Sequence, residues 1–520
     1  MEWLNPAVIV VYLVAMVMFG FWGKRRTKNV SDYLVAGRRL GPIFYTATLV
    51  TVVLGGASAI GGVGLGYEHG ISGMWMVAAI GIGIIILSLA FAPLLQRLKI
   101  YTVVQMLTLR YGHEATQGAS FVMLAYTLMI CATSTGAYAS IFVVLFDWER
   151  WVSVLVGGSV VLIYSVIGGM FSITLADVVQ FVVMTIGLFF LMVPYGLSEA
   201  GGWAGMQERL DAEFFTIDGI GLQSIITYFV VYTLGILIGQ DIWQRVFTGR
   251  TPGITRWGGF TAGIYILAFG VAGAIVGMTV ASLQPGIENR DDVFSIVATE
   301  MLPYGLGGIA MAGGIAAMMS TASGGLIAAA TVARTDVVPL VKNVLAGKRP
   351  GQLSAQQAAQ MAHDNVERAD DYEADVASNR RWVLGLGIAV MALALIVPDV
   401  VAALTIAYAI LVGGLLVPII GAMVWRRSTG VGAASSMLAG TVATLGTMIY
   451  LEITAENALD GVFANEPIYF GLLASAIVFI VVSLSSKPTP DDVWRAWQQR
   501  SKHGVDDTPH QADTAAQRII

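Results

Sequence analysis

The chain is organised as long apolar runs separated by short charged or turn-forming breaks. A run of about 17 to 28 apolar residues is long enough to cross the hydrocarbon core of a bilayer as a helix. The pattern predicts thirteen such spans, at residues 5–23, 42–67, 72–95, 117–146, 151–168, 171–195, 222–240, 257–283, 305–333, 382–398, 400–425, 430–451 and 467–485. The sequence therefore predicts an all-α integral membrane protein of the plasma or inner membrane, with the lipid bilayer as its surroundings.

Basic residues predict which end of each span faces the cytoplasm. With the N-terminus outside, only Arg150, Arg209 and Arg290 of the 29 Lys and Arg fall on the outer side. Cytoplasmic loops of membrane proteins carry an excess of Lys and Arg, and a shift of the frame by one helix would destroy this asymmetry. We therefore expect an outer N-terminus and a cytoplasmic C-terminus.

Two polar segments interrupt the apolar pattern. The loop 335–381 carries Pro339, Pro350 and a run rich in Gln, Ala, Asp and Glu over 352–375, which predicts one exposed cytoplasmic helix. The tail 486–520 is also polar and follows a transmembrane domain over residues 1–485. Neither segment is long enough to be an independent enzyme domain.

Composition narrows the function classes. Of 520 residues, 56% are apolar and 12% charged, 60 are glycine, and the mean hydropathy is +0.74, which is typical of multi-span membrane proteins. The net charge of −5 gives no sign of a nucleic-acid partner. Cys131 is the single cysteine, so no internal disulfide or cysteine metal site can form. The five His are not spaced as ligands, and no hydrolase motif appears, so no enzyme activity is expected.

Hydroxyl side chains are grouped in the apolar span 305–333. Ala317, Ser320 and Thr321 stand at i, i+3 and i+4, so one helical face offers two hydroxyls beside a backbone carbonyl. Neutral oxygen donors suit a small hard cation that must be released again. Small and hydroxyl residues also mediate packing between membrane helices, and spacing alone leaves both interpretations open.

The second span is unusually rich in glycine. Six glycines fall between 55 and 66, with Thr51 and Ser58 nearby. This density lowers helix stability and lets the backbone unwind where carbonyls must face an ion, although close helix packing would explain several of the glycines too.

Several segments carry a resemblance to a known family. They are Ser31–Gly41 (SDYLVAGRRLG), Tyr164–Met170 (YSVIGGM) with Asp177–Gln180 (DVVQ), Gln244-Arg245, Ala316–Thr321 (AAMMST) and Trp425–Arg427 (WRR). On these motifs, spread in order over about residues 10 to 450, the chain resembles the sodium/solute symporter family, which includes the sodium/proline and sodium/glucose transporters.

The resemblance implies a leucine-transporter-like core over residues 42–425. This core would hold five plus five helices as inverted repeats, about 42–195 and 222–425. One helix would precede the core and two would follow it. Substrate and sodium would lie near the midplane, at the broken second and seventh spans.

The resemblance also implies the ion ligands. The main sodium site would use carbonyls of Thr51, Leu54 and Ala317 with the side chains of Ser320 and Thr321. A second sodium, as some relatives bind, would use Asp177, Ser320 and Ser323, although Gly324 stands where a further hydroxyl is expected. Asp177 has an alternative role, in which it caps its helix and holds the inner gate through a basic partner.

The sequence says less about the substrate than about the fold or the ion site. The pocket walls implied by the fold give the candidates Ser58, Tyr67, Tyr126, Tyr138, Tyr228 and Tyr232, each of which also fits a packing role. Gly239-Gln240-Asp241 replaces the Asn-Gln-Tyr pattern of sugar-carrying relatives. We therefore favour an amino acid or a small organic acid over a sugar, nucleobase or vitamin.

Together these features predict a secondary active transporter that couples inward sodium movement to uptake of a small polar organic solute by alternating access. A sensory receptor on the same fold is the rival from another class, but no kinase-like extension follows residue 485. The neutral hydroxyl site argues against proton coupling, and nothing repeats as the filter of a channel would.

Overall fold

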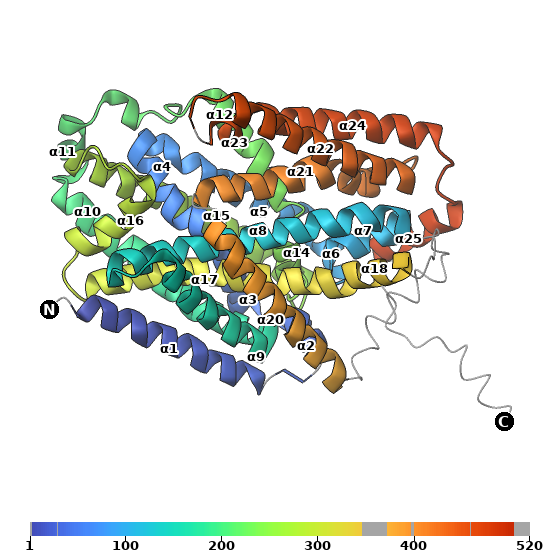
Figure 1. Cartoon of the computed structure of the whole chain (residues 1–520), viewed down its shortest axis with the longest axis horizontal. Coiled ribbons are helices and arrows are strands. Elements are labelled where there is room, and N and C mark those ends of the chain that lie inside the picture. Colours follow the sequence, from blue (N-terminus) through green and yellow to red (C-terminus); the bar gives the residue numbers. More distant parts are fainter. Residues whose placement is uncertain are drawn as a thin grey trace.

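The protein is a bundle of helices that run roughly along one direction (Figure 1). The computed structural model describes residues 3–25, 27–28, 30–345, 372–396, 400–457 and 459–503. Within these ranges no β-strand forms, and the one extended pairing is an isolated bridge between Leu40 and Gly249. The prediction of an all-α membrane protein is confirmed.

The helices of the N-terminal half are α1 (Leu4–Lys24), α2 (Val30–Val35), α3 (Pro42–Val53), α4 (Gly62–His69), α5 (Trp75–Ile86), α6 (Ala92–Arg97), α7 (Val103–Tyr111), α8 (His113–Phe146), α9 (Arg150–Thr185), α10 (Val193–Glu199) and α11 (Gly202–Arg209). Those that follow are α12 (Leu222–Tyr228), α13 (Leu234–Ile236), α14 (Gln240–Val246), α15 (Pro252–Leu283), α16 (Val293–Ile296), α17 (Leu306–Val332), α18 (Val338–Leu345), α20 (Tyr372–Ile396), α21 (Val400–Val424), α22 (Gly430–Thr454), α23 (Asp460–Phe463), α24 (Glu466–Ser485) and α25 (Asp491–His503). Short π-helical turns join several of them.

Ten helical stretches are long and apolar enough to cross a membrane in the described part of the chain, or eleven if one bent pair counts as a span. Two of the ten, Ala57–Arg97 and Arg150–Glu199, are 41 and 50 residues long. Each holds segments of two predicted spans and turns at a glycine with positive φ between them, Gly70 (φ 63°) after α4 and Gly169 (φ 59°) within α9. The predicted boundaries at 68–71 and 169–170 therefore coincide with these turns, and in the described residues the predicted spans are helical apart from their breaks.

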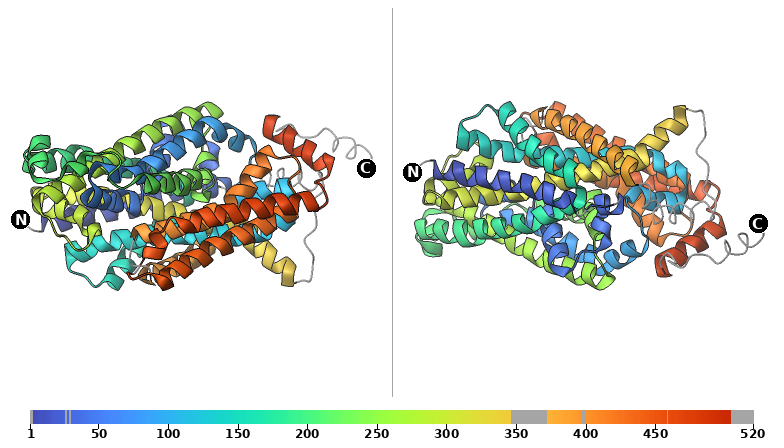
Figure 2. Two further views of the ribbon diagram at one scale, coloured as in Figure 1. Left: turned by 90° about the horizontal axis from the view of Figure 1, so that it is seen from above. Right: turned by 90° about the horizontal axis from the view of Figure 1, so that it is seen from below.

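α17 lies in the middle of the bundle. Every residue in its apolar window is buried, whereas the windows of α1, α22 and α24 are 28%, 22% and 28% buried. In Figure 1, α22 and α24 lie side by side along one edge and α1 packs against α9 along the other. The side chains that α1, α22 and α24 leave exposed are large and apolar, as lipid-facing residues must be. The left view of Figure 2, from above, shows α22 and α24 packed as a pair.

Two spans are broken in their middle, as the resemblance implied. The second span unwinds at Leu54 and Gly55, between α3 and the π-helical turn Ala57–Gly61 that leads into α4. The seventh breaks at 237–239, where Leu222–Ile236 and Gln240–Val246 meet at a bend of 50°. The predicted end of this span at residue 240 is therefore wrong, because the helix resumes as α14 and runs on to Val246.

The polar segments are largely helical where the structure describes them, except residues 486–490 of the tail. The predicted loop 335–381 begins with α18 and ends with the first turns of α20, and residues 346–371 lie outside the described residues, with most of the predicted cytoplasmic helix. Residues 491–503 of the tail form α25, which packs against α6 and α7.

Glycines let α4 and α15 approach each other closely. A Cβ at Gly277 would overlap the backbone of Val63 and Tyr67, and a Cβ at Gly66 would lie 2.6 Å from the Cα of Ala274. Small residues at a crossing bring two membrane helices into backbone contact. This contact fixes α4, which follows the first helix break.

We expect Gly277→Ala to destabilise the protein by about 1–3 kcal/mol, because the added methyl group overpacks this crossing. The measurement is the thermal unfolding midpoint of the purified protein in detergent. Gly446→Ala on α22 is the matched control, since a Cβ there meets no atom within 4 Å. Equal midpoints for the two variants would contradict the proposed crossing.

Candidate functional site

The first helix break lies directly against the hydroxyl face of α17. The Thr321 hydroxyl donates to the carbonyl oxygen of Val52 at 2.8 Å, and the carbonyls of Thr51 and Ala317 each lie 3.4 Å from the same oxygen. A Cβ at Gly55 would lie 2.7 Å from the Thr321 Oγ1, so glycine permits this approach. Four oxygen atoms from two helices therefore meet within one buried site.

The structure brings most of the predicted sodium ligands together. Thr51, Ala317 and Thr321 share the contacts above, and Leu54 lies at the break itself with its backbone turned out of the helix. The donors are neutral carbonyl and hydroxyl oxygens, which suit a monovalent hard cation. The Ser320 hydroxyl instead donates to Asp177 at 2.6 Å.

Asp177 is the centre of a second polar cluster. Its carboxylate accepts hydrogen bonds from Ser320 and Thr48, and its Oδ2 lies 3.3 Å from the Arg245 Nη2. Both charged side chains are at most 1% exposed. Burial of an unpaired charge in a low-dielectric interior is very costly, so each side chain stabilises the other.

The residues proposed for a second sodium surround this ion pair. The Ser323 hydroxyl donates to the carbonyl of Ser320 at 3.0 Å rather than to Asp177. A Cβ at Gly324 would lie 3.1 Å from the Arg245 Nη2. Because Gly324 has no side chain, the Arg245 guanidinium fits beside it and contacts the Asp177 carboxylate.

A small cavity lies beside the first break. Its volume is ≈ 20 Å³, about enough for one water molecule. The lining residues that bear on function are Gly55, Gly56, Ser58, Thr321, Asp241 and Tyr408. Ser58, a predicted pocket residue, and Thr321, a predicted ion ligand, therefore line the same space.

Asp241 and Tyr408 are residues that the sequence analysis did not place in the site. Asp241 stands in the first turn of α14, directly after the second break, and its Oδ1 accepts a hydrogen bond from the Tyr126 hydroxyl at 2.9 Å. The rings of Tyr126 and Tyr408 pack edge to face at 5.5 Å. The available signal was a carboxylate two residues after Gly239 in an apolar span, which was interpreted only as a departure from the pattern of sugar-carrying relatives.

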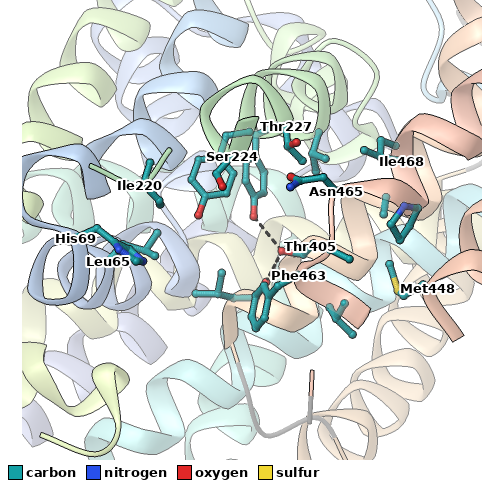
Figure 3. A pocket seen from close by; sticks show the side chains of 18 of the residues that line it. Leu65, His69, Ile220, Ser224, Thr227, Thr405, Met448, Phe463, Asn465 and Ile468 are labelled. Atoms are coloured by element: carbon teal, nitrogen blue, oxygen red, sulfur yellow. Dashed lines mark hydrogen bonds between the residues drawn. The ribbon is translucent and has the colours of Figure 1, made fainter. Parts of the chain in front are cut away.

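A larger cavity of ≈ 320 Å³ lies between α4, α12, α21 and α23 (Figure 3). Figure 3 shows His69, Ser224, Thr227, Thr405 and Asn465 arranged around it. Tyr228 and Tyr232, two predicted pocket residues, also line it, and the hydroxyls of Tyr232 and Thr405 are 3.0 Å apart.

The two cavities lie along neighbouring parts of one side of α21. Leu404 and Tyr408 line the small one, whereas Val401, Thr405 and Ala409 line the large one. The ring of Tyr232, in the wall of the large cavity, packs edge to face on that of Tyr408, in the wall of the small one.

The remaining predicted pocket residues lie elsewhere. The Tyr67 hydroxyl donates to the carbonyl of Gln284 and accepts from the amide of Ile287, so it ties α4 to the loop after α15. Tyr138 packs on Phe142 and against Gly157, between α8 and α9. Neither residue lines either cavity.

The family model described as "Sodium:solute symporter family" matches residues 33–347 of the chain. The chain belongs to the sodium:solute symporter family. Sodium/proline symporters of Staphylococcus aureus strains JH9 and NCTC 8325 / PS 47 are each 24% identical to this symporter over 516 residues, which cover 94% of each chain.

The structure of a Na+-coupled sialic acid symporter in a substrate-bound, outward-open state superposes on this symporter with a TM-score of 0.72. It is 15% identical, and the match covers 94% of this chain and 99% of the other. The fold is thus the leucine-transporter-like fold that the sequence predicted. The protein is an integral membrane transporter that uses sodium, not an enzyme.

We expect Arg245→Met to destabilise the symporter by about 3–5 kcal/mol, because it leaves the Asp177 carboxylate buried without its partner. The thermal midpoint of the purified protein measures the loss. Arg426→Met is the control, since its ion pair with Asp491 is more than 60% exposed on both sides and should contribute about 0–1 kcal/mol. The double variant Asp177→Asn/Arg245→Met should recover most of the lost stability, and a loss equal to that of Arg245→Met alone would refute the pairing.

Proposed function

We propose that this symporter couples the inward movement of sodium to the uptake of a small polar organic solute, with an amino acid or a small organic acid favoured. The observation that carries the proposal is the unwound backbone at Leu54–Gly55, which lies against the Thr321 hydroxyl and beside the small cavity. An ion bound there would fix the backbone that also forms the wall of the solute site. Each ligand would then raise the affinity for the other.

The sodium site would use the residues predicted from the sequence. Carbonyls of Thr51, Leu54 and Ala317 and the hydroxyls of Ser320 and Thr321 would hold the ion. One sodium per cycle is the number that the structure favours, because Arg245 already supplies Asp177 with a positive charge. The set Asp177, Ser320 and Ser323 would accept a second sodium only if that guanidinium moved away.

One sodium is enough to drive concentrative uptake. A charge that moves down about 100 mV releases about 2.3 kcal/mol. A tenfold sodium gradient adds about 1.4 kcal/mol. The sum corresponds to accumulation on the order of several hundred-fold, and no covalent chemistry is needed.

The two cavities support an alternating-access cycle. The small cavity is too small for an organic solute in this conformation, whereas the large one has room for a small organic molecule. We propose that the larger cavity, with Tyr228 and Tyr232 in its wall, is the vestibule through which solute reaches the centre. Movement of α21 and of the bent α13–α14 pair would join the two spaces.

The breaks support the proposed repeats of about 42–195 and 222–425. Each break lies in the first span of its half, as an inverted repeat requires. The names of the relatives concern proline and sialic acid, which are an amino acid and an acidic sugar. They fit the favoured substrate classes without selecting one of them.

We propose that the end of the bundle that holds α25 is cytoplasmic. Arg97, Arg110, Arg426 and Arg427 contact backbone or side chains at that end, and Arg290 lies on the vestibule at the other. This distribution is what the positive-inside rule expects.

The double variant Ser320→Ala/Thr321→Ala should raise the sodium concentration needed for half-maximal uptake by about tenfold or more, because two oxygen donors are lost. Uptake into proteoliposomes at varied sodium concentration measures this effect, with amino acids, organic acids, sugars and nucleobases as test solutes. Thr261→Ala on α15 is the control, since its hydroxyl bonds only within its own exposed turn. Uptake that is indifferent to sodium and to the double variant would contradict the proposal and favour proton coupling. Solute binding with no transport would favour a sensory role.

The orientation can be tested with single cysteines, because the native Cys131 is 2% exposed and should not react. In intact cells a membrane-impermeant maleimide should label Glu208→Cys but not Lys487→Cys. Both should react after the membrane is permeabilised. The reverse pattern in intact cells would invert the proposed topology.

A further inference from the structure

We propose that Asp241 binds a positively charged amino group of the transported solute. The substrate would then be an amino acid or a related zwitterionic amine rather than an organic anion. This inference rests on the proposed sodium-coupled uptake and narrows its substrate class.

Asp241 stands where a solute must bind. It follows the bend at 237–239 and is 3% exposed. It lines the small cavity together with Gly55 and Gly56 of the other break. Thr321, the hydroxyl that contacts the proposed ion ligands, lines the same cavity. A carboxylate in this position faces the meeting point of both broken helices.

The surrounding residues fix the carboxylate but do not neutralise it. The Tyr126 hydroxyl donates to Oδ1 at 2.9 Å, and the Tyr126 ring is held by its edge contact with Tyr408. The next residue toward the break, Gln240, anchors α14 through hydrogen bonds to the backbone of Tyr101 and Val103. The backbone amides of Asp241 and Ile242 also donate to this carboxylate. A carboxylate has about four acceptor positions, so about one remains for a solute ammonium.

The nearest guanidinium pairs in direct contact with Asp177 and has a smaller Coulomb interaction with Asp241. Arg245 lies one turn further along α14, and its Nη2 is 3.3 Å from Asp177. Around the breaks, the described helices therefore bury two carboxylates, Asp177 and Asp241, with one guanidinium. The formal sum is one negative charge, located at Asp241.

This charge selects among solute classes. With one sodium and a zwitterion bound, the site as a whole is neutral. With one sodium and an organic anion, it would carry a net negative charge, and the solute carboxylate would repel Asp241. Uncompensated charge is expensive at membrane depth, so the zwitterion is favoured. The solute carboxylate could be held by the sodium ion or by amide N–H groups freed at the break.

A competing role for Asp241 is to attract the sodium ion itself, because the carboxylate and Thr321 share the cavity. The two roles differ in one observable. If Asp241 serves sodium, its neutralisation weakens sodium binding in the absence of any solute. If it serves the solute, sodium binding alone is weakened much less than amino-acid binding.

The experiment compares isosteric pairs that differ in one group. Full-length protein in detergent is tested by thermal shift against amino acids and their 2-hydroxy-acid counterparts, such as alanine with lactate and proline with tetrahydrofuran-2-carboxylate. Glucose is included as a neutral solute, and each compound is tested in sodium and in potassium. We expect at least one amino acid to stabilise the protein in sodium only, and its hydroxy-acid or ether counterpart to be inactive at a concentration about 30-fold higher.

Asp241→Asn should weaken the apparent affinity for that amino acid by about 30-fold or more. It should weaken the shift caused by sodium alone far less than it weakens amino-acid binding, and the shift that remains also shows that the variant is folded. Asp241→Glu keeps the charge and should keep the preference for the amine. The control Asp218→Asn, on an exposed loop before α12, should behave like the wild-type protein.

Several outcomes would overturn the inference. These are preferred binding of the hydroxy acids or glucose, an unchanged affinity in Asp241→Asn, or loss of the sodium-only shift in a variant that still unfolds cooperatively. Sodium coupling that persists in any of these cases would leave the proposed function standing. If Asp241→Asn does not fold, the wild-type panel still decides the substrate class. No sodium-dependent response to any compound would instead contradict the proposed function.

Discussion

The structure depends on one constraint, which is that a backbone unwound inside a membrane must find partners for its polar groups. Lipid supplies no hydrogen-bond partners at that depth, and each unpaired carbonyl or amide costs several kcal/mol. The Thr321 hydroxyl partners Val52 at the first break, and the indole Nε1 of Trp243 donates to the carbonyl of Leu237 at the second. These contacts keep both breaks in place while leaving carbonyl lone pairs for an ion.

The burial of α17 follows from this constraint. A helix that must present hydroxyls to an unwound neighbour has to approach it closely, and α17 is built largely of Gly, Ala, Ser and Met. Gly324 is an example, because a Cβ at this position would lie 2.6 Å from the side chain of Val52. The same gap admits Arg245, so one small residue determines both the helix contact and the cation that accompanies Asp177.

Much of this arrangement could be predicted because it follows local patterns. Apolar runs gave the spans, glycines between 55 and 66 gave the first break, and the spacing of Ala317, Ser320 and Thr321 gave one oxygen-rich face. Contacts between distant segments were different. The pairing of Asp241 with Tyr126 and the edge contact of Tyr408 depend on how α8, α14 and α21 rotate about their axes, which no single-span pattern encodes. The end of the seventh span was predicted wrongly for a related reason. The polar residues after the 50° bend look like the end of a span, but they form the helix α14.

The fixed pair of Arg245 with Asp177 has a consequence for how membrane voltage acts on the cycle. Because this pair is neutral and stays within the protein, it does not contribute charge to the movement of the core across the electric field. With Asp241 ionised, the empty carrier then bears one negative charge at its centre, and the carrier loaded with sodium and a zwitterion bears none. An inside-negative potential would therefore leave the loaded step almost untouched and accelerate the return of the empty site toward the outer face.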